Sequence, residues 1–291
     1  MSKVQPVGVL MAWSDRQQQM LRAMGLRVWA PSGAPEPAEP EVSNAPERHV
    51  SVAPERKLEG LREPQHEPAQ KQVRPLIDNE RAQRIATLGW PALREEVAAC
   101  TACDLCQSRK QTVFGMGHPQ AHWMVVGEAP GEQEDAQGEP FVGAAGQLLD
   151  NMLRALSLTR ASDCGSGPAP PLAQCVFIAN ALKCRPPRNR NPEPAELQSC
   201  EPFLARQIAL VQPRIILAMG RFAVQSLLHS SEPIGKLRGR VHQVLGVPLV
   251  VTYHPAYLLR NLPEKARAWE DLCLAASTVE RASAALQTPT S

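Results

Sequence analysis

Short apolar runs alternate with longer amphipathic stretches along the second half of the chain. The short runs are rich in β-branched residues and predict strands at Trp123–Gly127, Val176–Ala179, Ile215–Ala218 and Leu249–Thr252. The longer stretches repeat apolar residues with the helical period and predict helices at Ala144–Ser157, Pro194–Val211, Arg221–His229 and Glu264–Ala282. This alternation predicts an α/β fold, with three α/β/α layers around a central, mainly four-stranded parallel sheet.

The N-terminal part of the chain follows a different pattern. Residues 14–29 form a short amphipathic stretch, whereas residues 31–70 hold eight prolines and no Ile, Met, Cys or aromatic residue. Such a segment cannot bury enough apolar surface to offset the entropy of ordering. We therefore predict a docking peptide over 1–30, a Pro-rich disordered linker over 31–89, a folded domain over 90–282 and a disordered tail over 283–291.

Composition restricts the function classes. The net charge is only +2, so binding to a nucleic acid would require a local concentration of positive charge. No apolar run is long enough to span a membrane, and the N-terminus lacks the basic region of a secretory signal. We expect a cytoplasmic protein in which the eight cysteines serve as metal or cluster ligands more readily than as disulfides.

Four cysteines have the spacing of a metal site. Cys100 and Cys103 form a C-x-x-C, Cys184 follows the second predicted strand, and Cys200 lies on the inward stripe of a predicted helix. Four thiolates suit zinc or an iron–sulfur cluster, and spacing does not choose between them. Cys200 could instead be a small core residue, and Cys106 is the one plausible substitute ligand.

A glycine-rich segment follows the first predicted strand. It begins at Gly127-Glu128-Ala129-Pro130-Gly131 and passes through Glu134, Asp135 and Phe141 into the helix from Ala144. Glycines let backbone amides approach a ligand closely, although a plain strand-to-helix turn looks similar. Other polar residues follow later strands, and ligands of parallel sheets bind at the carboxyl ends of strands.

Three segments resemble the motifs of one enzyme family. The run GEAPGEQEDAQGEPFVGAAGQLLD is similar to the first motif of the family 4, thermophile-type uracil-DNA glycosylases. Asn180–Pro187 resembles their central motif, and Tyr253–Arg260 resembles their C-terminal motif. The spacing of the four cysteines matches the ligands of that family's four-iron four-sulfur cluster. The resemblance covers roughly residues 90–275 and implies hydrolysis of the N-glycosidic bond of uracil in DNA, as a step of base excision repair.

The resemblance also implies residue roles. Phe141 would stack on the flipped uracil, Asn180 would read its Watson–Crick edge, and His254 would donate a hydrogen bond to uracil O2. Glu128 would activate water or stabilise the sugar cation, with Glu134 and Asp135 as rivals. The backbone near Gly127 and Gly131 would contact the base. Each of Phe141, Asn180 and His254 also has an ordinary structural interpretation.

Basic and apolar residues predict the contact with DNA. One cluster lies between residues 182 and 191, a second between 236 and 240, and a third segment offers an apolar wedge beside a cation. The residues expected to bind DNA are Lys183, Arg185, Arg188, Arg190, Lys236, Arg238, Arg240, Tyr257, Leu258 and Arg260. A solvated basic face would have the same composition.

Residues 16–29 carry a separate resemblance, to the N-terminal peptide of the clamp-loader psi subunit of bacterial DNA polymerase III. This implies a bacterial protein that is associated with the nucleoid and docks through residues 14–29 on the replicative clamp loader, although the segment could instead pack on the catalytic domain. We expect a monomer. Two other functions stay open, namely a catalytically silent adaptor with the same fold and a zinc or redox protein working through its C-x-x-C.

Overall fold

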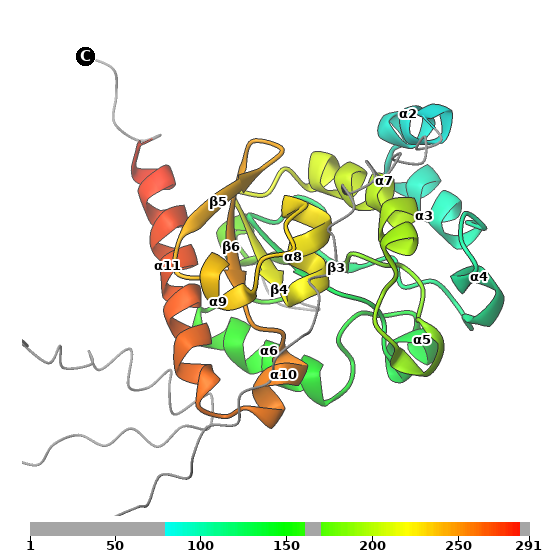
Figure 1. Cartoon of the computed structure of the whole chain (residues 1–291). Coiled ribbons are helices and arrows are strands. Elements are labelled where there is room, and N and C mark those ends of the chain that lie inside the picture. The colour runs from blue at the N-terminus through cyan, green and yellow to red at the C-terminus, as the bar shows by residue number, and fades with distance from the viewer. Residues whose placement is uncertain (1–78, 161–169, 286–291) are drawn as a thin grey trace, which may run out of the picture. The chain divides into compact units, whose positions relative to one another are not determined.

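The computed structural model describes residues 79–160 and 170–285 (Figure 1). The predicted docking peptide, residues 31–78 of the predicted linker and residues 286–291 lie outside the described residues. None of the helices in the described ranges is both long and apolar enough to cross a membrane.

The sheet contains the four predicted parallel strands and two antiparallel edge strands. Its order is β1-β3-β2-β4-β6-β5. The parallel centre consists of β2 (Trp123–Gly127), β3 (Val176–Asn180), β4 (Ile215–Met219) and β6 (Val247–Thr252). The edges, β1 (Met116–Gly117) and β5 (Val241–Val244), pair antiparallel with β3 and β6. The sequence pattern did not predict them, because β1 has two residues and β5 is half exposed.

Helices cover the sheet in the expected layers. On one face, Met124, Phe177, Ile216 and Leu249 lie in one core cluster. The apolar residues that pack with them belong to α2 (Asn79–Thr87), α3 (Trp90–Ala98), α7 (Pro194–Val211) and α8 (Arg221–Leu228). The strand residues of opposite phase are buried too, and α11 (Glu264–Ala285) contacts β4 and β6 outside that cluster. Because side chains alternate along a strand, both faces of a fully buried strand require a helical cover.

The described helices include the four predicted ones, whose ends differ by at most three residues, and several that the sequence analysis did not predict. They are α2 (Asn79–Thr87), α3 (Trp90–Ala98), α4 (Leu105–Ser108), α5 (Glu132–Gln137), α6 (Ala144–Ala155), α7 (Pro194–Val211), α8 (Arg221–Leu228), α9 (Ile234–Leu237), α10 (Pro255–Arg260) and α11 (Glu264–Ala285), with short 3₁₀ turns η1 (Leu172–Gln174) and η2 (Pro187–Asn189). The helix α11 continues to Ala285, so the predicted start of the tail at residue 283 is wrong.

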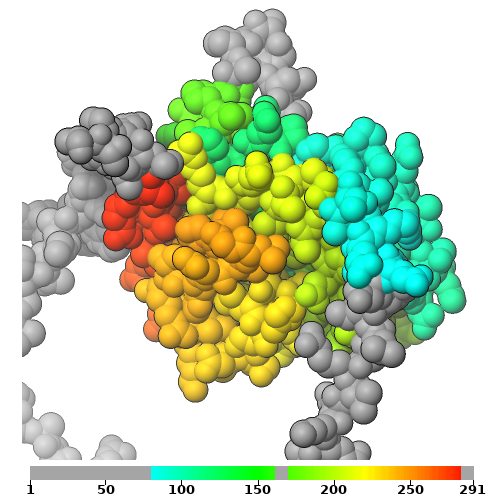
Figure 2. All heavy atoms as spheres, turned by 90° about the horizontal axis from the view of Figure 1, so that it is seen from above, coloured from blue at the N-terminus to red at the C-terminus, as the bar shows by residue number. Residues whose placement is uncertain are grey.

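The helix α2 overturns the predicted boundary between linker and domain. It lies within residues 31–89 yet packs against α7, and its Ile85 is fully buried. Figure 2 shows α2 and α3, in cyan, beside the yellow-green surface of α7. The Arg81 side chain donates to the Ser199 carbonyl and lies over the Phe203 ring. The folded part therefore begins no later than Asn79, and the polar sequence of α2 concealed this because few of its residues are buried.

Candidate active site

The carboxyl ends of the four parallel strands surround one cavity of about 750 Å³. Glu128 follows β2, Asn180 ends β3, Gly220 follows β4, and His254 follows β6. Parallel strands present their carboxyl ends at one edge of the sheet, so residues distant in sequence meet there.

The cavity gathers half of the residues predicted to bind uracil or DNA or to take part in catalysis. Those that line it are Glu128, Gly131, Glu134, Phe141, Asn180, Arg190, His254, Tyr257 and Arg260. Gly127 is not a lining residue, but it packs against two of them, Phe141 and Asn180. Asp135, Lys183, Arg185, Arg188, Lys236, Arg238, Arg240 and Leu258 are not among the lining residues.

Gly127 and Asn180 are partners across the β2–β3 pair. A Cβ atom on Gly127 would overlap the Asn180 Oδ1 and would lie 2.6 Å from the Phe141 ring. Glycine is therefore required here so that the amide and the aromatic ring can approach the strand end. The Asn180 side chain is 2% exposed, and its Oδ1 has no hydrogen-bond partner among the described residues.

Phe141 is held in a left-handed backbone conformation, with φ of 56°. Its carbonyl oxygen accepts hydrogen bonds from both terminal nitrogens of Arg160, at 3.1 and 3.2 Å, and Arg160 also pairs with Asp150. A Cβ atom on Gly146 would overlap the same carbonyl. A conformation this strained persists only where its surroundings hold it, so these contacts fix the Phe141 ring in the cavity.

Glu134 secures the loop on the other side of Phe141. Its carboxylate accepts backbone N–H groups from Gly131 at 3.1 Å, Val142 at 3.0 Å and Gly143 at 3.3 Å. A carboxylate occupied by three amides is suited to positioning rather than to proton transfer. Asp135 is 2% exposed and accepts the Lys110 amide at 3.0 Å, away from the cavity. The geometry therefore does not support Glu134 or Asp135 in the role predicted for Glu128, which is to activate water or stabilise the sugar cation.

His254 faces Phe141, and the two rings stack with centroids 5.4 Å apart. Its Nδ1 accepts the Ala256 amide at 3.2 Å and so caps α10. Burial lowers the pKa of His254 to about 4, against the opposing effect of Glu134. The ring is therefore neutral near pH 7, and because Nδ1 is an acceptor its proton resides on Nε2.

Glu128 is the one lining carboxylate with a strongly shifted pKa. Burial raises that pKa to about 7, although the charge and the backbone N–H of Arg221 oppose the rise. Gly220, with φ of 95°, comes so close that a Cβ atom there would overlap the Glu128 Oε1. A carboxyl group tuned to this range can exchange a proton near neutral pH.

Three residues predicted to bind DNA are structural instead. Lys183 is 1% exposed, and its Nζ donates to the Asn180 carbonyl and the Gln207 Oε1, both at 2.7 Å. Arg238 pairs with Glu270 at 3.0 Å and with the fully buried Asp271 at 3.1 Å. Leu258 is fully buried in α10, whereas its neighbour Leu259 is 42% exposed. Within the segment predicted to form the apolar wedge, Leu259 is thus the accessible leucine, because helical geometry turns adjacent residues to different faces.

The remaining basic residues differ in their freedom. Arg185 donates to Asn189 and lies 3.7 Å from Glu132, and Arg190 pairs with Glu193 and Glu196. Arg188, Lys236 and Arg240 are exposed, and no ion pair to them occurs among the described residues. These three cations are available for phosphates.

The four predicted cysteine ligands lie in one neighbourhood. Cys184 and Cys200 are buried in a small apolar cluster against which Cys103 packs. Burial raises the pKa of Cys103, and the charges of Cys184 and Cys100 raise it further. Burial also raises the pKa of Cys200 to about 12, with Cys184 and Cys103 contributing. Cys106 adds to the field at Cys184, so the substitute ligand lies nearby as well.

Cationic donors already point at two of these sulfurs. Arg109 donates to the Cys184 Sγ at 3.1 Å, and Arg81 donates to the Cys100 Sγ at 3.5 Å. Within the described ranges, no three His, Cys, Asp or Glu side chains are arranged to hold a single metal ion. The four thiols are the side chains here that could hold a multi-thiolate group, and the two arginines would offset its negative charge.

Comparison with known proteins identifies the family of the chain that forms this cavity. The sequence model of the Uracil DNA glycosylase superfamily matches residues 114–273. The type-4 uracil-DNA glycosylase of Archaeoglobus fulgidus is 39% identical over 172 residues, which are 56% of this chain and 80% of the relative. The chain belongs to the type-4 uracil-DNA glycosylases. The type-4 enzyme of Saccharolobus solfataricus is 40% identical over 62% of this chain and 81% of its own length, and that of Thermotoga maritima is 39% identical over 64% and 93%.

Two site residues of this type-4 uracil-DNA glycosylase escaped the sequence analysis. Arg221, which faces Glu128, follows Gly220 directly after β4, the one parallel strand end from which no site residue was predicted. The rule that ligands bind at every such strand end could have found it. Arg160 carried no signal, because only the folded chain brings it to Phe141.

Proposed function

We propose that this chain hydrolyses the N-glycosidic bond between uracil and deoxyribose in DNA and leaves an abasic site. One observation carries the proposal: in a type-4 uracil-DNA glycosylase, Glu128, Phe141, Asn180 and His254 line one cavity. The chemistry requires a flipped base to be held while positive charge develops on the sugar and negative charge on uracil.

Uracil is recognised by Phe141 and Asn180. The aromatic ring stacks on the base, and the Asn180 amide pairs with its Watson–Crick edge. The buried Oδ1 is an acceptor without a partner among the described residues, and uracil supplies the N3–H donor that it lacks. Cytosine offers an acceptor at that position, so the Oδ1 would stay unpaired at a cost of roughly 1–3 kcal/mol.

His254 stabilises the departing base. Its Nε2–H donates to uracil O2, because Nδ1 is occupied by the Ala256 amide. With a pKa of about 4 the imidazole stays neutral and donates a hydrogen bond without first giving up its proton.

Glu128 completes the reaction from the other side. The carboxylate, beside Gly220 and Arg221, orients the attacking water and stabilises the cationic sugar. In this assignment Glu134 and Asp135 are positioning groups, each held by backbone amides.

DNA is held by the exposed cations and by α10. Arg188, Lys236 and Arg240 contact phosphates, Tyr257 and Arg260 border the cavity, and Leu259 fills the gap left by the flipped base.

Cys100, Cys103, Cys184 and Cys200 would hold a four-iron four-sulfur cluster. The match between their spacing and the cluster ligands of the family to which the chain belongs supports a cluster over zinc. Bound there, the cluster would tie the segments that follow α3 and β3 to α7, and β3 ends at Asn180. Arg109 and Arg81 would compensate the charge of the thiolates.

The N-terminal peptide is proposed to dock on the replicative clamp loader. The resemblance of residues 16–29 to the psi peptide supports this, and a tether would raise the local concentration of the enzyme at replication forks. A pull-down with residues 1–30 tests it, and failure to retain the clamp loader would count against docking.

One experiment tests the enzymatic proposal. Purified protein is incubated with a uracil-containing oligonucleotide, abasic sites are cleaved with alkali, and His254→Ala and Asn180→Ala are compared with the wild type. We expect cleavage by the wild type and a loss of about 100-fold or more in each variant. Arg281→Ala, a change at an exposed residue of α11, is the control. Equal activity in all four proteins would refute the assigned roles, and no activity in the wild type would refute the function.

A further inference from the structure

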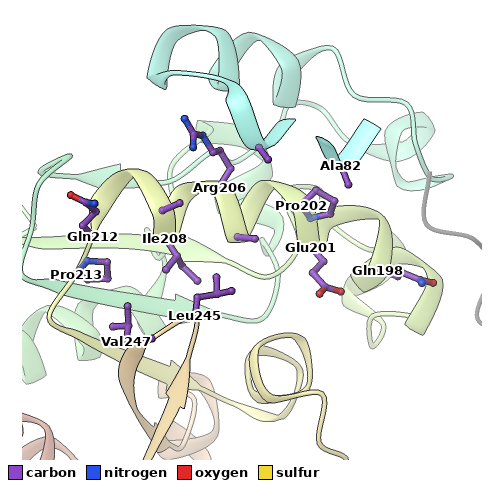
Figure 3. A pocket seen from close by; sticks show the side chains of 14 residues that line it. Ala82, Gln198, Glu201, Pro202, Arg206, Ile208, Gln212, Pro213, Leu245 and Val247 are labelled. Atoms are coloured by element: carbon purple, nitrogen blue, oxygen red, sulfur yellow. The ribbon is translucent and has the colours of Figure 1, made fainter. Parts of the chain in front are cut away.

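A second hollow, a groove of about 660 Å³, shares no lining residue with the catalytic cavity. Figure 3 shows it running along α7, with Ala82 of α2 on one side and Leu245 and Val247 on the other. Ala205 and Ala209 lie on the α7 face that forms its floor. Small side chains at helical spacing leave room for a second amphipathic helix to lay its apolar face in the groove.

Leu245, which lines the groove, is unusual both in its exposure to solvent and in its backbone conformation. It is 65% exposed, and it adopts φ of 48° in the two-residue turn that joins β5 to β6. Such turns favour Asn, Asp or Gly at this position, because other side chains are strained there. An exposed and strained leucine is unfavourable in the isolated domain and becomes useful when an apolar partner covers it.

The groove also offers polar partners to an occupant. Pro202 lines the groove and has no N–H to donate to the Gln198 carbonyl, another lining residue. Glu201 lies in the same wall with 38% of its side chain exposed, and its Oε1 is 3.4 Å from the His229 Nε2. The groove therefore presents a backbone acceptor and a carboxylate beside an apolar floor.

The chain itself contains a segment with the complementary chemistry. Residues 16–29 carry Leu26 and Trp29, three arginines and no acidic residue. An indole N–H needs an acceptor when its ring is buried, and arginines suit a carboxylate.

The location of the tether favours this segment over any free partner. The described domain begins at Asn79, three residues before Ala82 of the groove wall. Residues 30–78 connect the segment to that point. A flexible chain of this length has a root-mean-square end-to-end distance of roughly 35–40 Å. The effective concentration of residues 16–29 at the groove is therefore on the order of millimolar.

We propose that the groove of α2, α7 and the β5–β6 turn binds residues 16–29 of the same chain, with Leu26 and Trp29 packed against Leu245. A partner that binds residues 16–29 would have to displace them from the groove, since binding in the groove and binding to the partner need the same side chains. The inference does not depend on the identity of that partner.

Photo-crosslinking in the full-length holoprotein tests the proposal. With p-benzoylphenylalanine in place of Leu26, we expect crosslinks to peptides of α7 and the β5–β6 turn, at the mass of one chain. Leu245→Asp should reduce them at least fivefold and leave uracil excision unchanged. Leu172→Asp, at another exposed leucine, is the matched control and should leave them intact. Dispersed crosslinks, crosslinks unaffected by Leu245→Asp, or products only at the mass of two chains would overturn the proposal.

Hydrogen exchange provides a readout free of the artificial residue. Amides of residues 244–247 should exchange at least threefold faster in a Leu26→Ser/Trp29→Ser variant than in the wild-type full chain. Equal exchange in both proteins would contradict docking in the groove.

Discussion

The shape of the cavity depends on Gly127, because this residue has no side chain. Its hydrogen, in place of a side chain, lets the Asn180 amide and the Phe141 ring meet at the end of β2. Arg160 and Glu134 then hold the strained loop around Phe141 from both sides. The recognition of the base thus depends on residues that need not touch it.

Gly127→Ala tests this close approach. The new methyl group would overlap the Asn180 Oδ1 and displace the amide, so we expect kcat/KM on a uracil oligonucleotide to fall by about 100-fold. Alkaline cleavage assays measure this loss. Gly89→Ala, outside the cavity and with nothing within 4 Å of an added Cβ atom, is the control. Full activity in Gly127→Ala would show that the amide does not need its observed position.

Arg160→Gln tests the clamp on Phe141. Loss of the paired hydrogen bonds to the Phe141 carbonyl should loosen the ring and raise KM about tenfold, with a smaller change in kcat. Arg160→Lys, which retains a single donor, should recover part of the loss. Arg154→Gln, on the exposed side of α6, serves as the comparison. Unchanged KM in Arg160→Gln would remove Arg160 from the positioning of the base.

Glu128 should determine the pH dependence of the reaction. Its pKa is about 7, so the carboxylate fraction increases as pH rises from 6 to 8, and kcat/KM should rise with it. Glu128→Gln should be slower and should lack this limb of the profile.

The same shift predicts the sign of a stability effect. The Glu128 pKa is raised above its ordinary value of 4.5, so the folded state binds the proton more tightly than the unfolded state. Its contribution to the free energy of unfolding is complete below about pH 4.5 and is lost as pH rises through about 7. Chemical denaturation measures the free energy of unfolding of both proteins at pH 5 and at pH 8. The loss between pH 5 and pH 8 should be smaller in Glu128→Gln than in the wild type. An identical pH profile in both proteins would contradict the assigned pKa.

At the scale of elements, each parallel strand delivers one part of the site. The strands β2, β3, β4 and β6 bring Glu128, Asn180, Gly220 and His254 to one edge, and α10 follows directly after His254. The short helix divides its leucines between two tasks, since Leu258 is fully buried and Leu259 is exposed.

Leu258→Ala and Leu259→Ala separate these tasks. The first should lower the free energy of unfolding by about 2–5 kcal/mol, because it leaves a cavity. The second should change it by less than about 0.5 kcal/mol. Leu259→Ala should instead reduce excision from double-stranded DNA about fivefold or more and spare single-stranded DNA, where no gap must be filled. Equal losses on both substrates would exclude a wedge at Leu259.

At the scale of the whole molecule, the catalytic domain includes α2, which the polar composition had assigned to the linker. Ile85 is fully buried there, and Arg81 reaches toward the Cys100 sulfur and the Phe203 ring. The helix therefore covers both part of the core and the neighbourhood of the cysteines.

A chain that begins at residue 90 should be less stable than one that begins at residue 79. Loss of the buried Ile85 alone removes about 1.5–3 kcal/mol of burial energy. For a domain of this size the Tm should fall by about 5–10 °C. Thermal unfolding of the two proteins measures the difference, with the full chain as reference. Equal Tm values would restore the predicted boundary at residue 89.

The sequence alone determined the parallel centre of the sheet, the main helices and the chemistry of the strand ends. These follow from local periodicity and from motifs such as Gly127–Gly131, which are written in consecutive residues. Side-chain environment was decided only by the tertiary structure. Lys183 and Leu258 belong to motifs with a DNA-binding composition, yet the fold buries both, whereas Arg160 and Arg221 reach the site from positions without a motif. Burial and partnership arise from contacts between distant segments, and no local pattern records them.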